Sequence, residues 1–297
     1  MIGVTAIWSL IPTASELALR GVSPSLLAFC RLSIGLGFLI LIFFVQGGKV
    51  KNLIINKKVF LAGIALSGNY IFFSSSLWFT TGISRYLIAQ VQFDALAILA
   101  AIFLKEKLTL KRIIGIFCVV SGISFILFTT SEQEQLMAID MGFGSLLMLI
   151  AGLCFAIFGV TARALSHHNT LPFLIPTLII AVIIAGVTMS ILPSEQREPL
   201  IYYPTLITPI IVGSLGLIGT GLALLLTVAA LKYIDTATAG VITTFAVITN
   251  LIVARTLLNE PITPVIIFST LIVFTGIIMI TQTNTGTLKT NKRNETN

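Results

Sequence analysis

Charged side chains are scarce in this sequence. Aspartate, glutamate, lysine and arginine make up 10% of its 297 residues, whereas soluble domains carry about 25%. Hydrophobic residues make up 56% of the chain. A composition this poor in charge excludes an ordinary water-soluble domain and predicts a protein that resides in a lipid bilayer.

Cysteine and histidine are also rare. The three cysteines, Cys30, Cys118 and Cys154, fall inside apolar runs at unrelated spacings, so they form neither a metal motif nor a disulfide framework. We interpret them as small packing residues. The two histidines, His167 and His168, are neighbours in a polar break between apolar runs, where a solvated side chain is the simpler interpretation. We therefore expect neither a metal site nor a cofactor.

Apolar runs recur along the whole chain, separated by short polar breaks. Each is close to the roughly 20 residues that a helix needs to cross a bilayer core about 30 Å thick. A membrane β-barrel would instead show alternating segments of about 10 residues. The sequence therefore predicts an all-α integral membrane protein with ten transmembrane helices. The predicted spans are residues 2–19, 25–45, 59–80, 84–104, 111–129, 141–163, 172–192, 207–231, 236–258 and 262–282.

The basic residues gather on one side of this topology. If the N-terminus is cytoplasmic, 13 of the 18 lysines and arginines fall in cytoplasmic loops and in the C-terminal tail. Cytoplasmic loops of membrane proteins carry such an excess, so we expect both termini in the cytoplasm. Topology also accounts for the net charge of +7, and we expect no nucleic-acid partner.

The two halves of the chain contain a repeat. The stretch 104–123, LKEKLTLKRIIGIFCVVSGI, aligns with 258–277, LNEPITPVIIFSTLIVFTGI, at a constant offset of 154 that pairs Gly122 with Gly276. Five spans per half is an odd number, so the second half must enter the membrane upside down. Inverted repeats are typical of secondary transporters, which bind their solutes near the midplane. The predicted units are a first repeat at 1–129, a periplasmic connector at 130–140, a second repeat at 141–282 and a disordered, polar cytoplasmic tail at 283–297.

Two stretches of the chain resemble a known family: IWSLIPTASELALRGVSPSLLAFCRL through LKEKLT, and LCFAIFGVTARAL through LNEPIT. In both stretches the chain is similar to the EamA type of the drug/metabolite transporter (DMT) superfamily. The resemblance implies two inverted five-helix bundles around a central cavity, transport of small organic solutes and a bacterial inner-membrane location. Lys105 and Asn259 replace a glycine that is typical of the family at the close of the fourth span. The family is functionally broad, so the resemblance names no particular solute.

Asp94 is a lone carboxylate inside an apolar run. It lies nine residues after Arg85 and twelve before Glu106, which places it near the midplane at about 1.5 Å per residue. A carboxylate at that depth costs at least about 2.5 kcal/mol on insertion scales, so it should face the bundle interior or water and mark a functional site. Tyr86 and Gln90 precede it by eight and four residues and share its helix face.

Residues of other spans are candidate partners for Asp94. Arg31 lies roughly 9 Å below the outer end of the second span, and Asp94 descends from the same side. Glu16 lies near the outer end of the first span, and the third span supplies aromatic candidates for a cavity wall. The candidate substrate-binding or proton-binding residues are Glu16, Arg31, Tyr70, Trp78, Tyr86, Gln90 and Asp94.

Two interpretations of Asp94 and Arg31 remain open. The two residues either pair with each other and lock two helices together, or they bind solute or proton. The position that matches Asp94 in the second half is Ile248, which favours the functional interpretation, because a purely architectural lock would more naturally appear in both repeats. Burial favours the protonated carboxyl group and a nearby Arg31 favours the carboxylate, so the sequence leaves proton exchange undecided.

The predicted function is secondary transport of a small organic metabolite, an amino acid or a similar zwitterionic or cationic solute, by alternating access, with proton coupling left open. We expect no enzymatic activity. The alternative is a membrane-embedded enzyme or carrier acting on a lipid-linked substrate, which lacks the support of a metal cluster or a phosphate-binding glycine loop. A passive channel would need a selectivity filter. The expected partners are the solute and the lipid bilayer; the sequence does not predict the solute, the direction of transport, the coupling ion or the oligomeric state.

Overall fold

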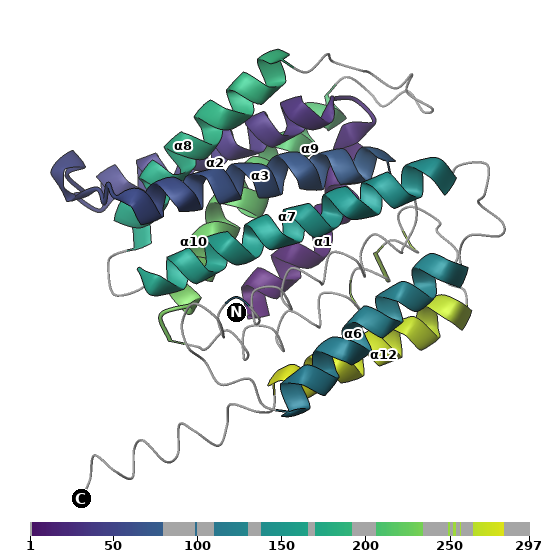
Figure 1. Cartoon of the computed structure of the whole chain (residues 1–297). Helices are drawn as coiled ribbons and strands as arrows, with labels where there is room; N and C mark the ends of the chain where they lie inside the picture. Colours follow the sequence, from purple (N-terminus) through teal and green to yellow (C-terminus); the bar gives the residue numbers. More distant parts are fainter. Residues whose placement is uncertain are drawn as a thin grey trace, which may run out of the picture.

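The computed structural model describes residues 2–79, 99, 110–129, 138–165, 170–191, 206–233, 249, 252–253, 256 and 264–281. All the regular secondary structure of this part of the chain is helical (Figure 1). Its elements are α1 (Ile2–Leu19), α2 (Pro24–Val45), the short η1 (Val50–Asn52), α3 (Lys57–Phe79), α6 (Leu110–Thr129), α7 (Ala138–Ala164), α8 (Thr170–Ile191), α9 (Ile207–Gly216), the π-helix η3 (Leu217–Leu222), α10 (Ala223–Ala230) and α12 (Pro264–Thr281).

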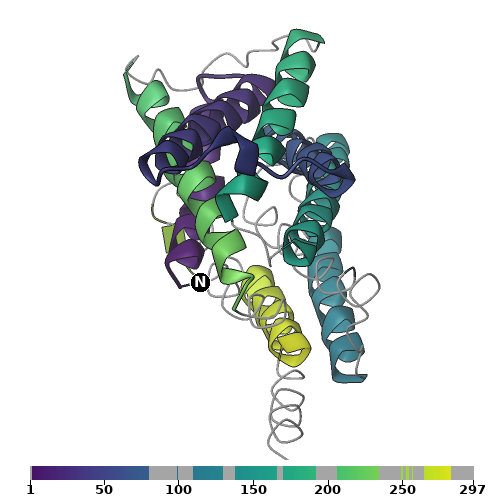
Figure 2. The same cartoon turned by 90° about the vertical axis from the view of Figure 1, so that its left-hand side faces the viewer.

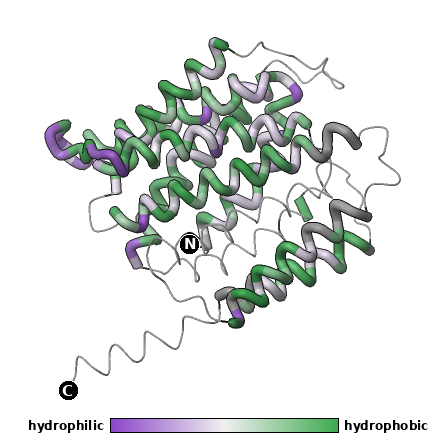
Figure 3. The backbone as a smooth tube through the Cα atoms, in the orientation of Figure 1, coloured by the Kyte–Doolittle hydropathy of each residue, from purple (hydrophilic) through white to green (hydrophobic). Residues whose placement is uncertain are grey.

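Long apolar helices confirm the all-α prediction for the described residues. Hydrophobic residues cover the helices, and hydrophilic residues collect at helix ends, most visibly between α2 and α3 (Figure 3). The predicted spans 84–104 and 236–258 lie outside the described residues, apart from a few single positions, so the count of ten remains a prediction. Five described stretches are long and apolar enough to cross a membrane: Pro24–Val45, Lys57–Phe79, Phe143–Ala164, Thr170–Ile191 and Ile207–Ala230.

Local sequence signals set the ends of α2. Ser23 caps its N-terminus by accepting a hydrogen bond from the Leu26 amide at 3.4 Å, and Pro24 occupies the first turn, where its missing N–H loses no helical bond. After the helix, Gly47 has a φ of 74°, a left-handed conformation that glycine adopts without strain. The chain therefore turns sharply there and enters α3.

One helix begins earlier than its predicted span. The sequence placed residues 130–140 in a connector, whereas α7 begins at Ala138. The helix therefore begins before the apolar run that the sequence predicts from residue 141.

The described helices pack against one another in several pairs. α3 packs against α7, and α1 packs against α9; α3 contacts α8, and α2 contacts η3; α2 meets α3, and α8 meets α10. The pair of α6 and α12 packs together on the side of the bundle opposite α8 (Figures 1 and 2). The repeat predicted from the sequence would pair α1 with α7, α2 with α8, α3 with α9–α10 and α6 with α12, and under that pairing the three contacts of α3 named here have counterparts among the others.

The glycines that the repeat pairs lie in one helix interface. A Cβ atom added to Gly122 of α6 would lie 2.8 Å from Val273 of α12, and one added to Gly276 of α12 would lie 2.9 Å from Val119 of α6. Val119 and Val273 are themselves 154 residues apart. At these contacts the residue numbers increase along α6 as they decrease along α12, so the two helices are antiparallel. The small residues allow the two backbones to approach closely.

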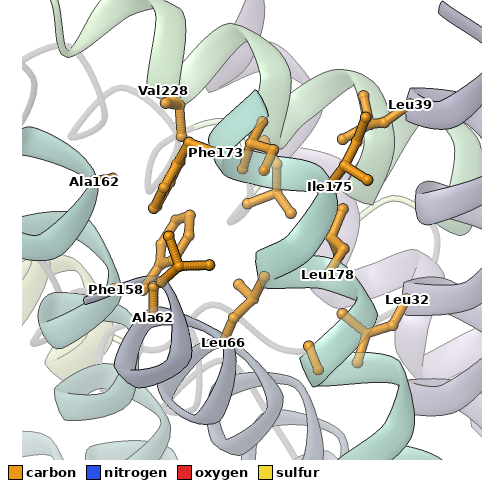
Figure 4. Close-up of a cluster of buried hydrophobic side chains, with 14 of the residues drawn as sticks. Leu32, Leu39, Ala62, Leu66, Phe158, Ala162, Phe173, Ile175, Leu178 and Val228 are labelled. Carbon is orange, nitrogen blue, oxygen red and sulfur yellow. The ribbon is translucent and has the colours of Figure 1, made fainter. Parts of the chain in front are cut away.

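Aromatic side chains fill the interior between α7 and α8. Phe158 has 0% of its surface exposed and Phe173 has 1%. Their rings are stacked with centroids 6.2 Å apart, and they face each other in Figure 4, with Ala62 and Leu66 of α3 beside them. This cluster fixes α3 against α7 and α8, so it sets the position of the side chains further along α3.

Asn69 and Cys154 join α3 to α7. The side-chain amide of Asn69 donates a hydrogen bond of 2.9 Å to the Ala151 carbonyl oxygen. Nearby, the Cys154 sulfur lies 2.9 Å from where a Cβ atom on Gly68 would be. The cysteine therefore packs closely against a neighbouring backbone, as expected of a small packing residue. A buried side-chain hydrogen bond between helices contributes about 0.6 kcal/mol in membranes.

Candidate functional site

Arg31 lies inside the bundle. It stands two turns from the start of α2, and only 3% of its surface is exposed. Its Nη1 donates a hydrogen bond of 3.2 Å to the Ser15 hydroxyl oxygen on α1. The guanidinium group therefore links the first two helices deep in the protein, where a charged group would otherwise be strongly unfavourable.

Two aromatic rings of α3 cover the guanidinium group. Its central carbon lies 4.8 Å from the centroid of the Tyr70 ring and 5.9 Å from the centroid of Phe73. Residues three apart share a helix face, so the two rings form one wall beside Arg31. A desolvated cation–π contact of this kind is worth about 2 kcal/mol.

A fourth element reaches the site beside Arg31. A Cβ atom added to Gly35, one helical turn after Arg31 on α2, would lie 2.8 Å from Cγ2 of Thr220. Thr220 belongs to the π-helix η3 and has 0% of its surface exposed. The site is therefore assembled from α1, α2, α3 and η3, which come from both halves of the chain.

The charge of Arg31 is not neutralised by the described part of the chain. Its described partners, Ser15, Tyr70 and Phe73, are all neutral, and its Nε has no hydrogen-bond partner among them. A buried cation is stable only when it is paired or hydrogen-bonded. The planar guanidinium fork matches a carboxylate in shape and charge, so this arrangement is suited to binding one.

Two other predicted site residues, Glu16 of α1 and Trp78 of α3, also lie in the described part of the chain. Glu16 follows Ser15 on α1, and its Oε2 is buried, but successive helix positions differ by about 100° in direction, so the two side chains diverge. Trp78 lies two turns beyond Tyr70, has 8% of its surface exposed, and packs in a core cluster with Leu77 and Met148. The structure thus brings Arg31 and Tyr70 together, while Trp78 is a packing residue in its described contacts.

Three predicted site residues, Tyr86, Gln90 and Asp94, lie outside the described residues. The expected contact between Arg31 and Asp94 therefore stays a prediction. In the described part of the chain, no group of three or more histidine, cysteine or acidic residues could hold a metal ion.

Ser15, Phe73 and Thr220 contact the site without having been predicted. Phe73 carried one usable signal, its spacing of three from Tyr70. Thr220 lies in the glycine-rich stretch GSLGLIGTGLALL, which indicates close helix packing but not which helix approaches. Ser15 carried no signal beyond its hydroxyl group.

One family model and several known proteins resemble this chain. The model of the EamA-like transporter family matches residues 1–128 and 142–282. The protein named "Uncharacterized transporter YyaM" of Bacillus subtilis is 28% identical over 151 residues, which are 50% of this chain and 49% of that protein. "Uncharacterized inner membrane transporter YhbE" of Escherichia coli K12 is 26% identical over 187 residues, which are 58% of this chain and 56% of that protein.

The match thus spans about half the length of these two relatives. A crystal structure titled "Crystal structure of protein" superposes with a TM-score of 0.72, at 17% sequence identity, over 96% of this chain and 97% of the other. At that identity the likeness establishes a shared fold.

Proposed function

Since this chain belongs to the EamA-like transporter family and is an integral membrane protein, we propose that it is a secondary transporter for an amino acid or a similar zwitterionic or cationic metabolite. The observation that carries this proposal is Arg31, a buried guanidinium group whose described partners are all neutral. A metabolite carboxylate binds the free edge of this group. Tyr70 and Phe73 hold its face, and Ser15 holds one of its terminal nitrogens.

The acidic candidates complement this carboxylate site. Asp94 is expected near the midplane, and Glu16 lies beside Ser15 on α1. We assign to Asp94 the binding of the solute's ammonium group or of a proton, because a lone intramembrane carboxylate is a functional site by default. A solute with one carboxylate and one ammonium group satisfies both charges, whereas a multiply phosphorylated solute would need more basic residues.

The proposed mechanism is alternating access by two inverted five-helix repeats, residues 1–129 and 141–282, joined by the connector at 130–140. The matching glycine contacts between α6 and α12 support it, and so do the paired contacts of the other helices. In inverted-repeat transporters the two halves rock around a central site. Arg31 and Thr220 come from different halves, which is the arrangement such a movement requires.

The proposed orientation places both termini, including the tail at 283–297, in the cytoplasm of a bacterial cell. Arg163, at the end of α7, donates a hydrogen bond to the Leu231 carbonyl oxygen beside Lys232. The loop before α3 is bonded to the start of α8 through Ile54 and Pro172. The ends of α7 and α10 and the loop between α2 and α3 lie at one end of the bundle (Figure 1). The basic residues in these segments fit the excess expected of cytoplasmic loops.

A thermal-shift screen of the detergent-purified full chain tests the proposed function. The probes are the twenty L-amino acids, S-adenosyl compounds, nucleosides and sugars. A ligand that binds the native state raises the apparent melting temperature with increasing concentration, and we expect this from one or more amino acids. Stabilisation by sugars or nucleosides alone, or by no probe, would contradict the proposal.

A further inference from the structure

The chain between α2 and α3 carries a concentrated positive charge. Residues 46–58, which include η1 and the first residues of α3, contain four lysines and no acidic residue; we call them the basic segment (Figure 3). All four lysine side chains are exposed: Lys49, Lys51, Lys57 and Lys58. The last two lie in the first turn of α3, where positive charge is unfavourable for the helix. Their charges therefore point to a partner outside the helix.

Two large apolar side chains of the basic segment lie outside the protein core. Val50 has 65% of its surface exposed and Ile55 has 86%. Between them, Leu53 and Ile54 are partly buried and pack against the core. The core thus covers one side of the segment and leaves Val50 and Ile55 on the other, where exposure to water would be unfavourable.

Hydrogen bonds hold the basic segment against the end of the bundle. The Ile54 amide donates to the Pro172 carbonyl oxygen of α8 at 3.0 Å. The Asn56 side chain accepts a hydrogen bond of 2.9 Å from the Val59 amide, which caps the start of α3. The exposed lysines and apolar side chains are therefore presented from a fixed backbone.

The helices on both sides of the basic segment expose apolar side chains up to its two ends. Phe44 and Val45 at the end of α2 have 56% and 79% of their surfaces exposed, and Phe60 and Leu61 near the start of α3 have 57% and 49%. Both helices are long and apolar enough to span a membrane, so these side chains face lipid. Lys57 precedes Phe60 by three residues and shares its helix face. The basic segment therefore lies at the level of the lipid headgroups, where lysines extend from apolar surface into the interface.

We propose that the basic segment binds anionic phospholipid headgroups: its lysines pair with the headgroup phosphates, and Val50 and Ile55 enter between the neighbouring acyl chains. Clusters of basic residues beside a membrane-spanning helix are suited to anionic lipids, and each residue near the surface contributes about fivefold in affinity. A zwitterionic lipid has no net negative charge and makes only the apolar part of this contact. The inference goes beyond solute transport and does not depend on the role of Arg31.

A tryptophan introduced at position 55 reports which lipid meets the basic segment. Ile55→Trp replaces a side chain that is 86% exposed, so it leaves the core packing intact. The full-length variant is placed in phosphatidylcholine nanodiscs that contain a fixed fraction of either brominated phosphatidylglycerol or brominated phosphatidylcholine. Bromine quenches tryptophan fluorescence on contact, and the wild-type chain supplies the signal of the two native tryptophans for subtraction.

We expect brominated phosphatidylglycerol to quench the added tryptophan more than its share of the bilayer predicts. Adding Lys49→Gln and Lys51→Gln to Ile55→Trp should lower this preference over phosphatidylcholine at least about fivefold, the value of one lysine. The matched control adds Lys111→Gln and Arg112→Gln, which remove the same charge from α6. Since α6 lies apart from the basic segment (Figures 1 and 2) and distant exposed charges are screened, the control should stay within about twofold.

Three results would overturn the inference. Equal quenching by the two brominated lipids would show that the basic segment does not select anionic headgroups. An equal loss of preference in the control would assign the preference to the net charge of the whole chain. An added tryptophan that neither lipid quenches would place the segment in water.

Discussion

The Arg31 guanidinium group lies against the Tyr70 ring, with its central carbon 4.8 Å from the ring centroid. This contact joins α2 to α3 where a charged side chain has only 3% of its surface exposed. A ring can stabilise such a charge without neutralising it. The described partners thus hold the cation in the bundle and bring no negative charge to it.

Substitutions of Tyr70 separate the ring from its hydroxyl group. Tyr70→Leu removes the cation–π contact and should lower the free energy of unfolding by about 2 kcal/mol. Tyr70→Phe keeps the ring over Arg31 and should therefore lower the free energy of unfolding less than Tyr70→Leu does. The apparent melting temperatures of the purified variants show which substitution is more destabilising. If Tyr70→Phe were less stable than Tyr70→Leu, the ring contact would be unimportant.

Substitution by alanine should have different effects at Gly276, in the interface between α6 and α12, and at Gly37 of α2, which has open space around it. In Gly276→Ala the new Cβ atom would lie 2.5 Å from the Gly115 carbonyl oxygen, whereas nothing lies within 4 Å of the corresponding position at Gly37. Forcing the backbones apart should cost about 1–3 kcal/mol, while Gly37→Ala should leave stability unchanged or raise it by up to about 1 kcal/mol.

The repeat extends this prediction to Gly122, whose Cβ position is also crowded by α12. Gly122→Ala should lower the apparent melting temperature about as much as Gly276→Ala. If either variant melts like Gly37→Ala, the close approach of the two helices at that glycine is not as described.

Phe158 should be the most sensitive of the described aromatic positions. It is fully buried and packs against both Phe155 and Phe173. Phe158→Ala should cost about 3 kcal/mol, the lower end of the range for buried phenylalanine, because lipid already solvates the ring in the unfolded state. The half-exposed Phe60 supplies the control, Phe60→Ala, and equal melting temperatures for the two variants would contradict the packing.

Asp94→Asn should abolish transport and leave expression and monodispersity intact. An asparagine amide neither carries a proton nor neutralises an ammonium group, so both roles proposed for Asp94 are lost. Transport is measured in proteoliposomes with and without a proton gradient. Transport that survives and still responds to the gradient would remove Asp94 from the mechanism.

Arg31 and Tyr70 were predictable from the sequence because a charged or polar side chain inside an apolar run stands out wherever its helix packs. Their neighbours were not. Phe73 looks like any lipid-facing or core phenylalanine until the position of α2 is known, and Thr220 depends on a π-helix. Hydrophobic periodicity does not reveal a π-helix of six residues, since it shifts the helical register within an already apolar run.

The sequence similarity that predicts the repeat is clearest where the two halves share small residues. Gly122 and Gly276 match because their contacts require a residue without a side chain on both sides of one interface. The charged positions diverge between the halves, as at Asp94 and Ile248. Contact partners such as Ser15 depend on how helices are arranged, and one sequence does not encode that arrangement in any local pattern.

The most direct test of carboxylate binding at Arg31 compares each L-amino acid with its carboxamide on the wild-type chain and on Arg31→Lys. The lysine keeps the positive charge and loses the planar fork that binds a carboxylate through two hydrogen bonds. We predict that an amino acid stabilises the wild-type chain, that its amide binds at least about tenfold more weakly, and that Arg31→Lys loses this preference. Equal stabilisation of the wild type by acid and amide, or a preference unchanged in Arg31→Lys, would contradict the account.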